Sequence, residues 1–141
     1  IRDRLLQSLI FVTPWVDYAH LLKSNFSQAT LQRANLQKAY LWGGILVQAD
    51  FSDALLDHAN LQSADLQEAD FSEAKLRFCY LREAKLQGTR WIGAHLNGAN
   101  FTKANLSRAD LRESSLNGTV FQATILEETK FSPSFALPIA S

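Results

Sequence analysis

The chain has 141 residues, in which 14 lysines and arginines balance 14 aspartates and glutamates, and it holds a single cysteine. The length fits one domain, and a formal net charge of zero creates no overall field that would recruit nucleic acid or an anionic membrane. A lone cysteine also excludes a disulfide framework.

Residues 1–18 form the first predicted element. Their apolar residues fall on one side of a short amphipathic helix that Thr13-Pro14 would end, namely Leu5, Leu6, Leu9, Ile10 and Val12. The stretch is far too short to span a bilayer. We expect an N-terminal capping segment here, and a helix that binds a membrane surface or a partner is the alternative.

A five-residue repeat dominates the next part of the chain. From Leu21 to Phe131 a large apolar residue occupies every fifth position, 23 times without omission, and the residue two places earlier is usually alanine. On an α-helix five residues advance by about 500°, which would scatter these side chains around the circumference. On a flat strand the period of 2 would send them to alternate faces. The chain must therefore bend once per repeat, which predicts an all-β solenoid.

A weaker period of twenty residues gives the number of corners. Phe51, Phe71 and Trp91 fall in one column of every twentieth residue, whereas the column that starts at Leu36 contains only leucine. Four repeats per coil would stack these rings about 4.8 Å apart as a ladder, in a solenoid of about six coils. Five of the six glycines lie two residues after a central apolar residue, where a tight turn favours positive φ.

Individual repeats carry a recognisable motif, as in Ala34-Asn35-Leu36-Gln37-Lys38, Ala64-Asp65-Leu66-Gln67-Glu68 and Ala109-Asp110-Leu111-Arg112-Glu113. The pattern resembles the pentapeptide-repeat family, whose usual unit is A(D/N)LXX, and the resemblance covers residues 19–131. It implies a right-handed quadrilateral β-helix with four five-residue sides per coil.

The ends of such a solenoid need covering, because an open coil exposes both core and unpaired backbone. We therefore divide the chain into a capping segment at 1–18, a β-helix at 19–131 and a C-terminal plug at 132–141. Pro133 and Pro138 in the last segment oppose the addition of another strand.

The sequence shows no catalytic or metal-binding pattern. A regular rod offers no cleft, the three histidines fall in different columns, and acidic and histidine spacings match no zinc, EF-hand or phosphate-loop template. We predict that the protein is not an enzyme, with no catalytic residues, cofactor or metal. Cys79 replaces an inward alanine, so we interpret it as a small buried residue and not as a reactive thiol.

Three sets of outward residues are candidate surfaces. The first candidate for partner binding is aromatic and apolar, and packing against a cap or loop is its alternative: Tyr40, Trp42, Ile45, Phe78, Tyr80 and Arg82. The second is an acidic patch that would dock a basic partner or be a solvated face: Asp50, Asp53, Asp70 and Glu73. The adjoining face is mildly basic and would bind an anion or aid solubility: Lys38, His58, Lys75, Arg77 and His95.

These observations favour a non-enzymatic interaction module that presents flat faces to a protein partner. We expect no direct nucleic acid binding, no membrane span, a monomer or weak dimer, and the cytoplasm rather than the periplasm or thylakoid lumen. The family resemblance supplies an alternative, since its fluoroquinolone-resistance members are acidic rods that mimic DNA and engage type II topoisomerases. The zero net charge argues against that alternative.

Overall fold

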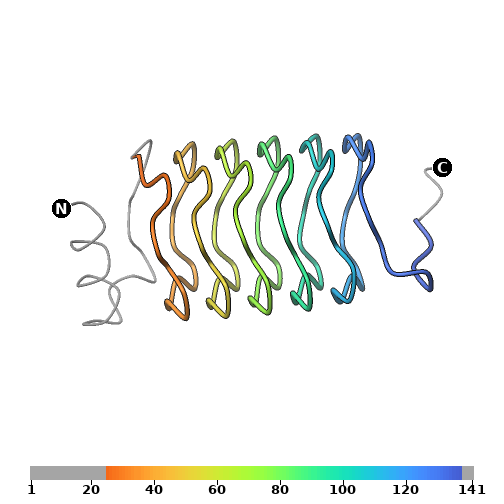
Figure 1. The fold of residues 1–141 in the computed structure, drawn as a ribbon, viewed down its shortest axis with the longest axis horizontal. Helices are drawn as coiled ribbons and strands as arrows, with labels where there is room; N and C mark the ends of the chain where they lie inside the picture. The colour runs from red at the N-terminus through yellow and green to blue at the C-terminus, as the bar shows by residue number, and fades with distance from the viewer. Residues whose placement is uncertain (1–24, 138–141) are drawn as a thin grey trace.

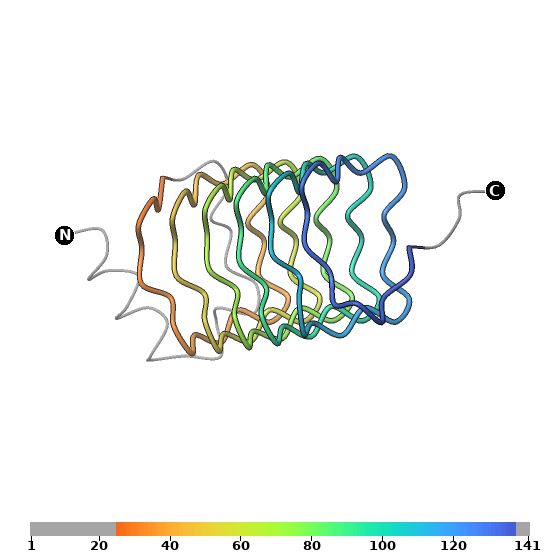
Figure 2. The same ribbon diagram turned by 45° about the vertical axis from the view of Figure 1, so that its right-hand side comes forward.

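The computed structural model describes residues 25–137, and the predicted N-terminal capping helix lies outside the described residues. The chain winds into coils stacked along one long axis, and it advances steadily from one end of the stack to the other (Figure 1). Turned by 45°, the same coils follow one another in parallel along the stack (Figure 2). The side chains that point inward from the coils are buried.

The coils are held in register by parallel β-bridges that always join residue i to residue i+20. The series begins at Asn25 with Ile45 and ends at Asp110 with Lys130. One coil therefore contains four pentads. Within residues 25–137 there is no helix and no strand longer than one bridged residue, because each side of the coil is too short before the next corner.

Each corner is a hydrogen-bonded turn. The central residue's carbonyl accepts the N–H three residues on, as when Ala29 donates to Phe26 at 3.0 Å. The residue two positions after the central residue has a φ between 54° and 73° at each of the 21 corners from Gln28 to Glu128. Only five of these 21 residues are glycine. A left-handed backbone costs other residues on the order of 1 kcal/mol each. Backbone bonds to the next coil offset that cost, as from Arg33 N–H to the Ser52 carbonyl at 2.9 Å.

The preference for asparagine or aspartate in each motif also has a local cause. Its side-chain oxygen accepts the backbone N–H two residues later, at 3.0 Å for Asp50 with Ser52 and 2.9 Å for Asp70 with Ser72. This Asx turn satisfies a backbone N–H at the corner that donates to no backbone carbonyl of a neighbouring coil. The polar residue therefore helps to form the bend.

The core consists of the central apolar residues and the small residues beside them. From Ala49 to Leu111 these side chains are at most 1% exposed. The predicted aromatic ladder is present: the ring of Phe71 stacks on Phe51 at 4.8 Å and on Trp91 at 4.2 Å between centroids. Phe101, from another side of the coil, meets Trp91 edge-on at 5.6 Å.

We number the four sides of the rod by their bridged residues, each taken with the corner that follows. Side 1 contains Thr30, Asp50, Asp70, Arg90, Asp110 and Lys130. Side 2 contains Asn35, Leu55, Lys75, His95 and Ser115, and side 3 contains Tyr40, Asn60, Tyr80, Asn100 and Val120. Side 4 contains Asn25, Ile45, Asp65, Lys85, Asn105 and Ile125.

Candidate interaction surface

An exposed aromatic corner lies between sides 2 and 3. Phe78 is 55% exposed, the most among the large hydrophobic residues that the structure describes, and Tyr80 beside it is 47% exposed. The ring of Phe78 stacks on His58 in the preceding coil, with centroids 5.3 Å apart and planes 16° from parallel. We call Phe78 and Tyr80 the aromatic corner.

Gly98 completes the seat of the Phe78 ring. A Cβ atom placed on Gly98 would lie 2.5 Å from Cδ1 of Phe78, so the ring rests directly on the glycine backbone. Phe78 itself has a φ of 57°. The ring is thus held between His58 and Gly98 while much of its surface faces solvent, and a rigid exposed aromatic side chain is a typical anchor for a protein partner.

The structure divides the first predicted contact set in two. Tyr40 and Tyr80 share a column, but Asn60 bridges to both and lies between them. The members Tyr40, Trp42 and Ile45 therefore lie two coils from Phe78, Tyr80 and Arg82, and the set is not one contiguous patch. Tyr40 and Trp42 each take part in a further interaction of their own.

An ion pair that the sequence analysis did not identify stabilises side 2. Asp57 Oδ2 accepts hydrogen bonds from Nε and Nη2 of Arg77 at 3.0 and 2.6 Å, and Asp57 Oδ1 accepts the Arg77 backbone N–H at 2.9 Å. The bridged residue of this repeat is Lys75, which cannot form an Asx turn. The missing acceptor comes instead from the preceding coil, and the twenty-residue spacing of Asp57 and Arg77 is the sequence signal for it.

Two opposing effects set the pKa of Asp57. Partial burial raises it, but the hydrogen bonds and the charge of Arg77 outweigh burial, and the pKa of Asp57 is lowered below its ordinary value. The carboxylate consequently remains ionised and paired. Among the described residues this pair and the one between Arg112 and Asp110 are the ion pairs of the rod.

The predicted acidic patch forms on side 1 and its corner. Asp50 and Asp70 are bridged neighbours in adjacent coils. Each carboxylate already accepts a hydrogen bond within its own repeat: the Ser52 hydroxyl donates to Asp50 and the Ser72 hydroxyl to Asp70, both at 2.6 Å. Asp53 and Glu73 are exposed at the corner, and Glu73 lies across Gly93 of the next coil.

Cys79 lies in the core, as the repeat pattern predicts. Its side chain is fully buried, and Sγ lies 3.3 Å from the Ala59 carbonyl oxygen and 3.5 Å from that of Leu56. Burial raises the pKa of the thiol far above its ordinary value. A neutral, enclosed thiol of this kind does not act as a nucleophile.

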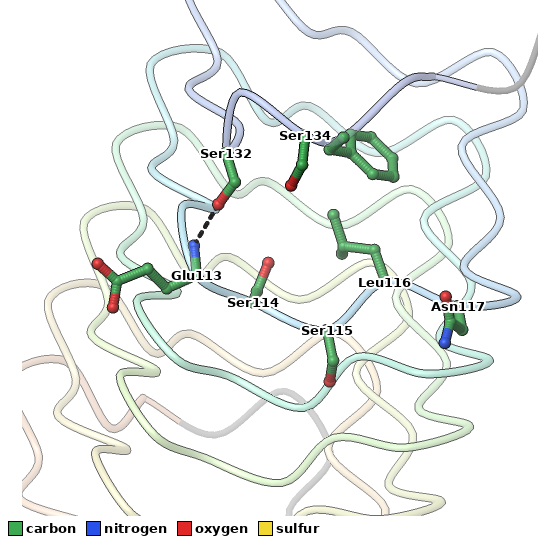
Figure 3. Close-up of a pocket in the computed structure, with 8 residues that line it drawn as sticks. Glu113, Ser114, Ser115, Leu116, Asn117, Ser132 and Ser134 are labelled. Atoms are coloured by element: carbon green, nitrogen blue, oxygen red, sulfur yellow. Dashed lines mark hydrogen bonds between the residues drawn. The ribbon is translucent and has the colours of Figure 1, made fainter.

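A shallow pocket of about 380 Å³ lies at the C-terminal end. The chain leaves the coil after Phe131, and Ser132 Oγ accepts the backbone N–H of Glu113 at 2.7 Å (Figure 3). Ser134 and Leu116 both line this pocket (Figure 3). The ring of Phe135 stacks on Phe131 at 4.9 Å.

The part of the chain that the structure describes contains no group of three or more histidine, cysteine or acidic side chains placed to hold a metal ion. In the same part, no helix has the length and apolar character needed to cross a bilayer.

Comparison with known proteins gives consistent results. The family model for pentapeptide repeats matches eight copies, over residues 17–41, 34–72, 79–118 and 104–132. No curated protein matches the chain.

Solved structures that are similar include the pentapeptide repeat protein Rfr23 of the cyanobacterium Cyanothece 51142, with a TM-score of 0.56, 25% identity, and coverage of 80% of this chain and 84% of that one. A pentapeptide repeat protein of the Arabidopsis thaliana thylakoid lumen has a TM-score of 0.52 and 29% sequence identity to this chain. The match covers 70% of this chain and 65% of that one. A pentapeptide repeat protein from Nostoc Pcc 7120 has a TM-score of 0.54 and 33% sequence identity. The match covers 62% of this chain and 77% of that one.

Proposed function

The chain belongs to the pentapeptide-repeat family, and on this premise we propose that it is a non-enzymatic interaction module that binds a protein partner through its aromatic corner. The observation that carries the proposal is the ring of Phe78, exposed over half its surface yet fixed between His58 and Gly98. An exposed side chain that is already ordered loses little conformational entropy when a partner covers it.

The surroundings of the aromatic corner support the same proposal. Tyr80 presents a second amphipathic ring on the adjoining side, and Arg82 follows at the next corner. Aromatic residues and arginine are enriched at the centres of protein interfaces. The backbone beneath them is hydrogen-bonded to the coils on both sides, through the bridges of Tyr80 with Asn60 and Asn100, which supports a preformed surface for a partner.

An affinity-capture experiment from native lysate tests the proposal. The double variant Phe78→Ala/Tyr80→Ala is compared with wild type and with Val120→Ala/Ile125→Ala, which removes two exposed apolar side chains from the last coil. We expect a partner that wild type and the control variant both retain and the aromatic-corner variant loses. Unchanged capture by the aromatic-corner variant, with its circular dichroism preserved, would exclude this surface.

The topoisomerase hypothesis makes a separate prediction. A DNA mimic needs a long, continuous negative face, but side 1 with its corner, which has the most carboxylates among the described residues, intersperses six of them with four cations. Those cations are Arg33, Arg90, Arg112 and Lys130. We expect no inhibition of gyrase supercoiling at micromolar protein, and inhibition in that range would favour DNA mimicry.

A further inference from the structure

We propose that side 2 binds an acidic, extended segment of the partner protein, with the aromatic corner at its edge. This inference rests on the proposed function and specifies the chemistry of the partner. It comes from the distribution of charge among the four sides, which the neutral total conceals.

Side 2 has the most positive charge balance of the four. Its only carboxylate is Asp57, already bound by Arg77 through three hydrogen bonds. Lys38 and Lys75 have no ion pair with any described residue, and His58 and His95 add two further donors. On side 1, by contrast, carboxylates outnumber cations by six to four, and on side 4 by four to two.

The cationic residues form a track along the rod. Lys75 and His95 are bridged neighbours, so their side chains leave the same side about 4.8 Å apart. Lys38, His58 and Phe78 follow one another in successive coils at the next corner. A partner segment lying along the axis would thus meet lysine, histidine and the Phe78 ring in turn, with Leu55 as an apolar contact in the bridged column beside Lys75.

The neighbouring charges favour a short acidic peptide over a nucleic acid. Asp53 and Glu73 are exposed at the corner that separates side 1 from side 2. A nucleic acid carries a phosphate on every nucleotide, so some of its phosphates would lie near these carboxylates and be repelled by them. A peptide can place carboxylates over Lys38 and Lys75 and an apolar side chain over Phe78, which matches the mixture of charge and aromatic surface on this side.

Fluorescence anisotropy with a defined probe tests the proposal. The probe is a fluorescein-labelled peptide of twelve residues in which glutamates flank a central leucine-phenylalanine pair, and a labelled single-stranded oligonucleotide of equal length is measured in parallel. The test variant is Lys38→Glu/Lys75→Glu. The matched control, Lys85→Glu/Lys103→Glu, makes the same change in net charge with exposed lysines of sides 4 and 3.

We expect the peptide to bind wild type, to bind the control variant within about twofold, and to bind the side 2 variant at least about tenfold more weakly. Binding should also weaken as salt rises. Equal losses in both variants, no binding to wild type, or an oligonucleotide that binds as tightly as the peptide would each overturn the proposal. Circular dichroism of both variants verifies that the coils remain folded.

The variant Phe78→Ala separates this inference from the proposed function. If the peptide requires the two lysines but not Phe78, the acidic-segment proposal holds and the aromatic corner is not its anchor. If capture of the native partner requires the aromatic corner while the peptide fails to bind, the proposed function holds and the acidic-segment proposal is wrong.

Discussion

The middle of the rod and its C-terminal end contain the same repeat, but they bury it differently. Leu96 and Phe101 are 0% exposed, whereas Leu116 and Phe121, which follow them in the same columns one coil later, are only partly buried. Every middle coil is covered by a coil on each side, and the last coil lacks one of these neighbours among the described residues. The contribution of a repeat therefore depends on its neighbours as much as on its own residues.

The small inward position shows how the end compensates. In most middle repeats it is alanine, but in the last coil it is Ser114, Thr119, Thr124 and Thr129. The three threonine hydroxyls donate to carbonyl oxygens of the preceding coil at 2.8 Å, reaching Leu96, Phe101 and Leu106. Where burial is incomplete, side-chain hydrogen bonds add a link between coils that the alanines of the middle do not provide.

The largest predicted difference concerns the aromatic core. Phe71→Ala removes a ring stacked on both faces and leaves an enclosed cavity, so we expect a loss of about 3–5 kcal/mol in the free energy of unfolding. Phe121→Ala should cost about half as much, because solvent already reaches that ring. Urea denaturation followed by circular dichroism measures both, and equal losses would contradict the proposed difference between middle and end.

Two glycines sharpen the comparison at the corners. Gly98 and Gly118 both have a φ of +73°, so alanine at either site should cost on the order of 1 kcal/mol through the backbone. Gly98→Ala should cost about 1 kcal/mol more, because its methyl group would displace the Phe78 ring. A Cβ atom placed on Gly118 would lie 3.7 Å or more from its nearest neighbours, so the methyl group of alanine fits there. Thermal melts of the two variants compare these costs, and identical melting temperatures would show that Phe78 is not seated on Gly98.

The threonine links predict a smaller effect at the end. Thr124→Val keeps the shape of the side chain and removes the hydroxyl that donates to the Phe101 carbonyl, so we expect a loss of about 1 kcal/mol. That carbonyl still accepts the Ala104 N–H at 2.9 Å, which limits the penalty. Chemical denaturation tests this, and a Val variant as stable as wild type would show that the hydroxyl adds nothing.

The two ion pairs predict the smallest difference, which appears at acidic pH. Because the folded-state pKa of Asp57 is lowered, its stabilising effect is present above the ordinary aspartate pKa of about 3.9 and is lost as pH falls through the folded value. Asp57→Asn should remove that part of the acid dependence, which appears as pH falls below about 3.9. Asp110→Asn should remove only a few tenths of a kcal/mol, because its pair with Arg112 lies within one repeat and is more exposed. Denaturation at several pH values compares them, and equal acid dependence in wild type and Asp57→Asn would show that the pair contributes nothing.

The candidate surface was only partly predictable from sequence. Outward positions follow from the period, so Phe78, Tyr80 and the acidic patch were assigned to the surface from their places in the repeat. The contacts between coils could not be predicted from the sequence, because a twenty-residue spacing says which residues are neighbours but not how their side chains lie. The seat of Phe78 on Gly98 and the pairing of Asp57 with Arg77 depend on rotamers that only the packed coils select.

The sequence alone determined the period and the inward residues, because a strict five-residue pattern leaves no other way to bury every leucine and phenylalanine, and the twenty-residue spacing of Phe51, Phe71 and Trp91 gave the four repeats per coil. Only the tertiary structure decided how neighbouring side chains meet. The twenty-residue spacing already makes Asp57 a neighbour of Arg77 and Phe78 a neighbour of Gly98, but the packed coils select the rotamers that join the first pair by hydrogen bonds and seat the Phe78 ring on the glycine. Charge and aromatic surface depend on those lateral contacts, which lie between coils and not within any one repeat.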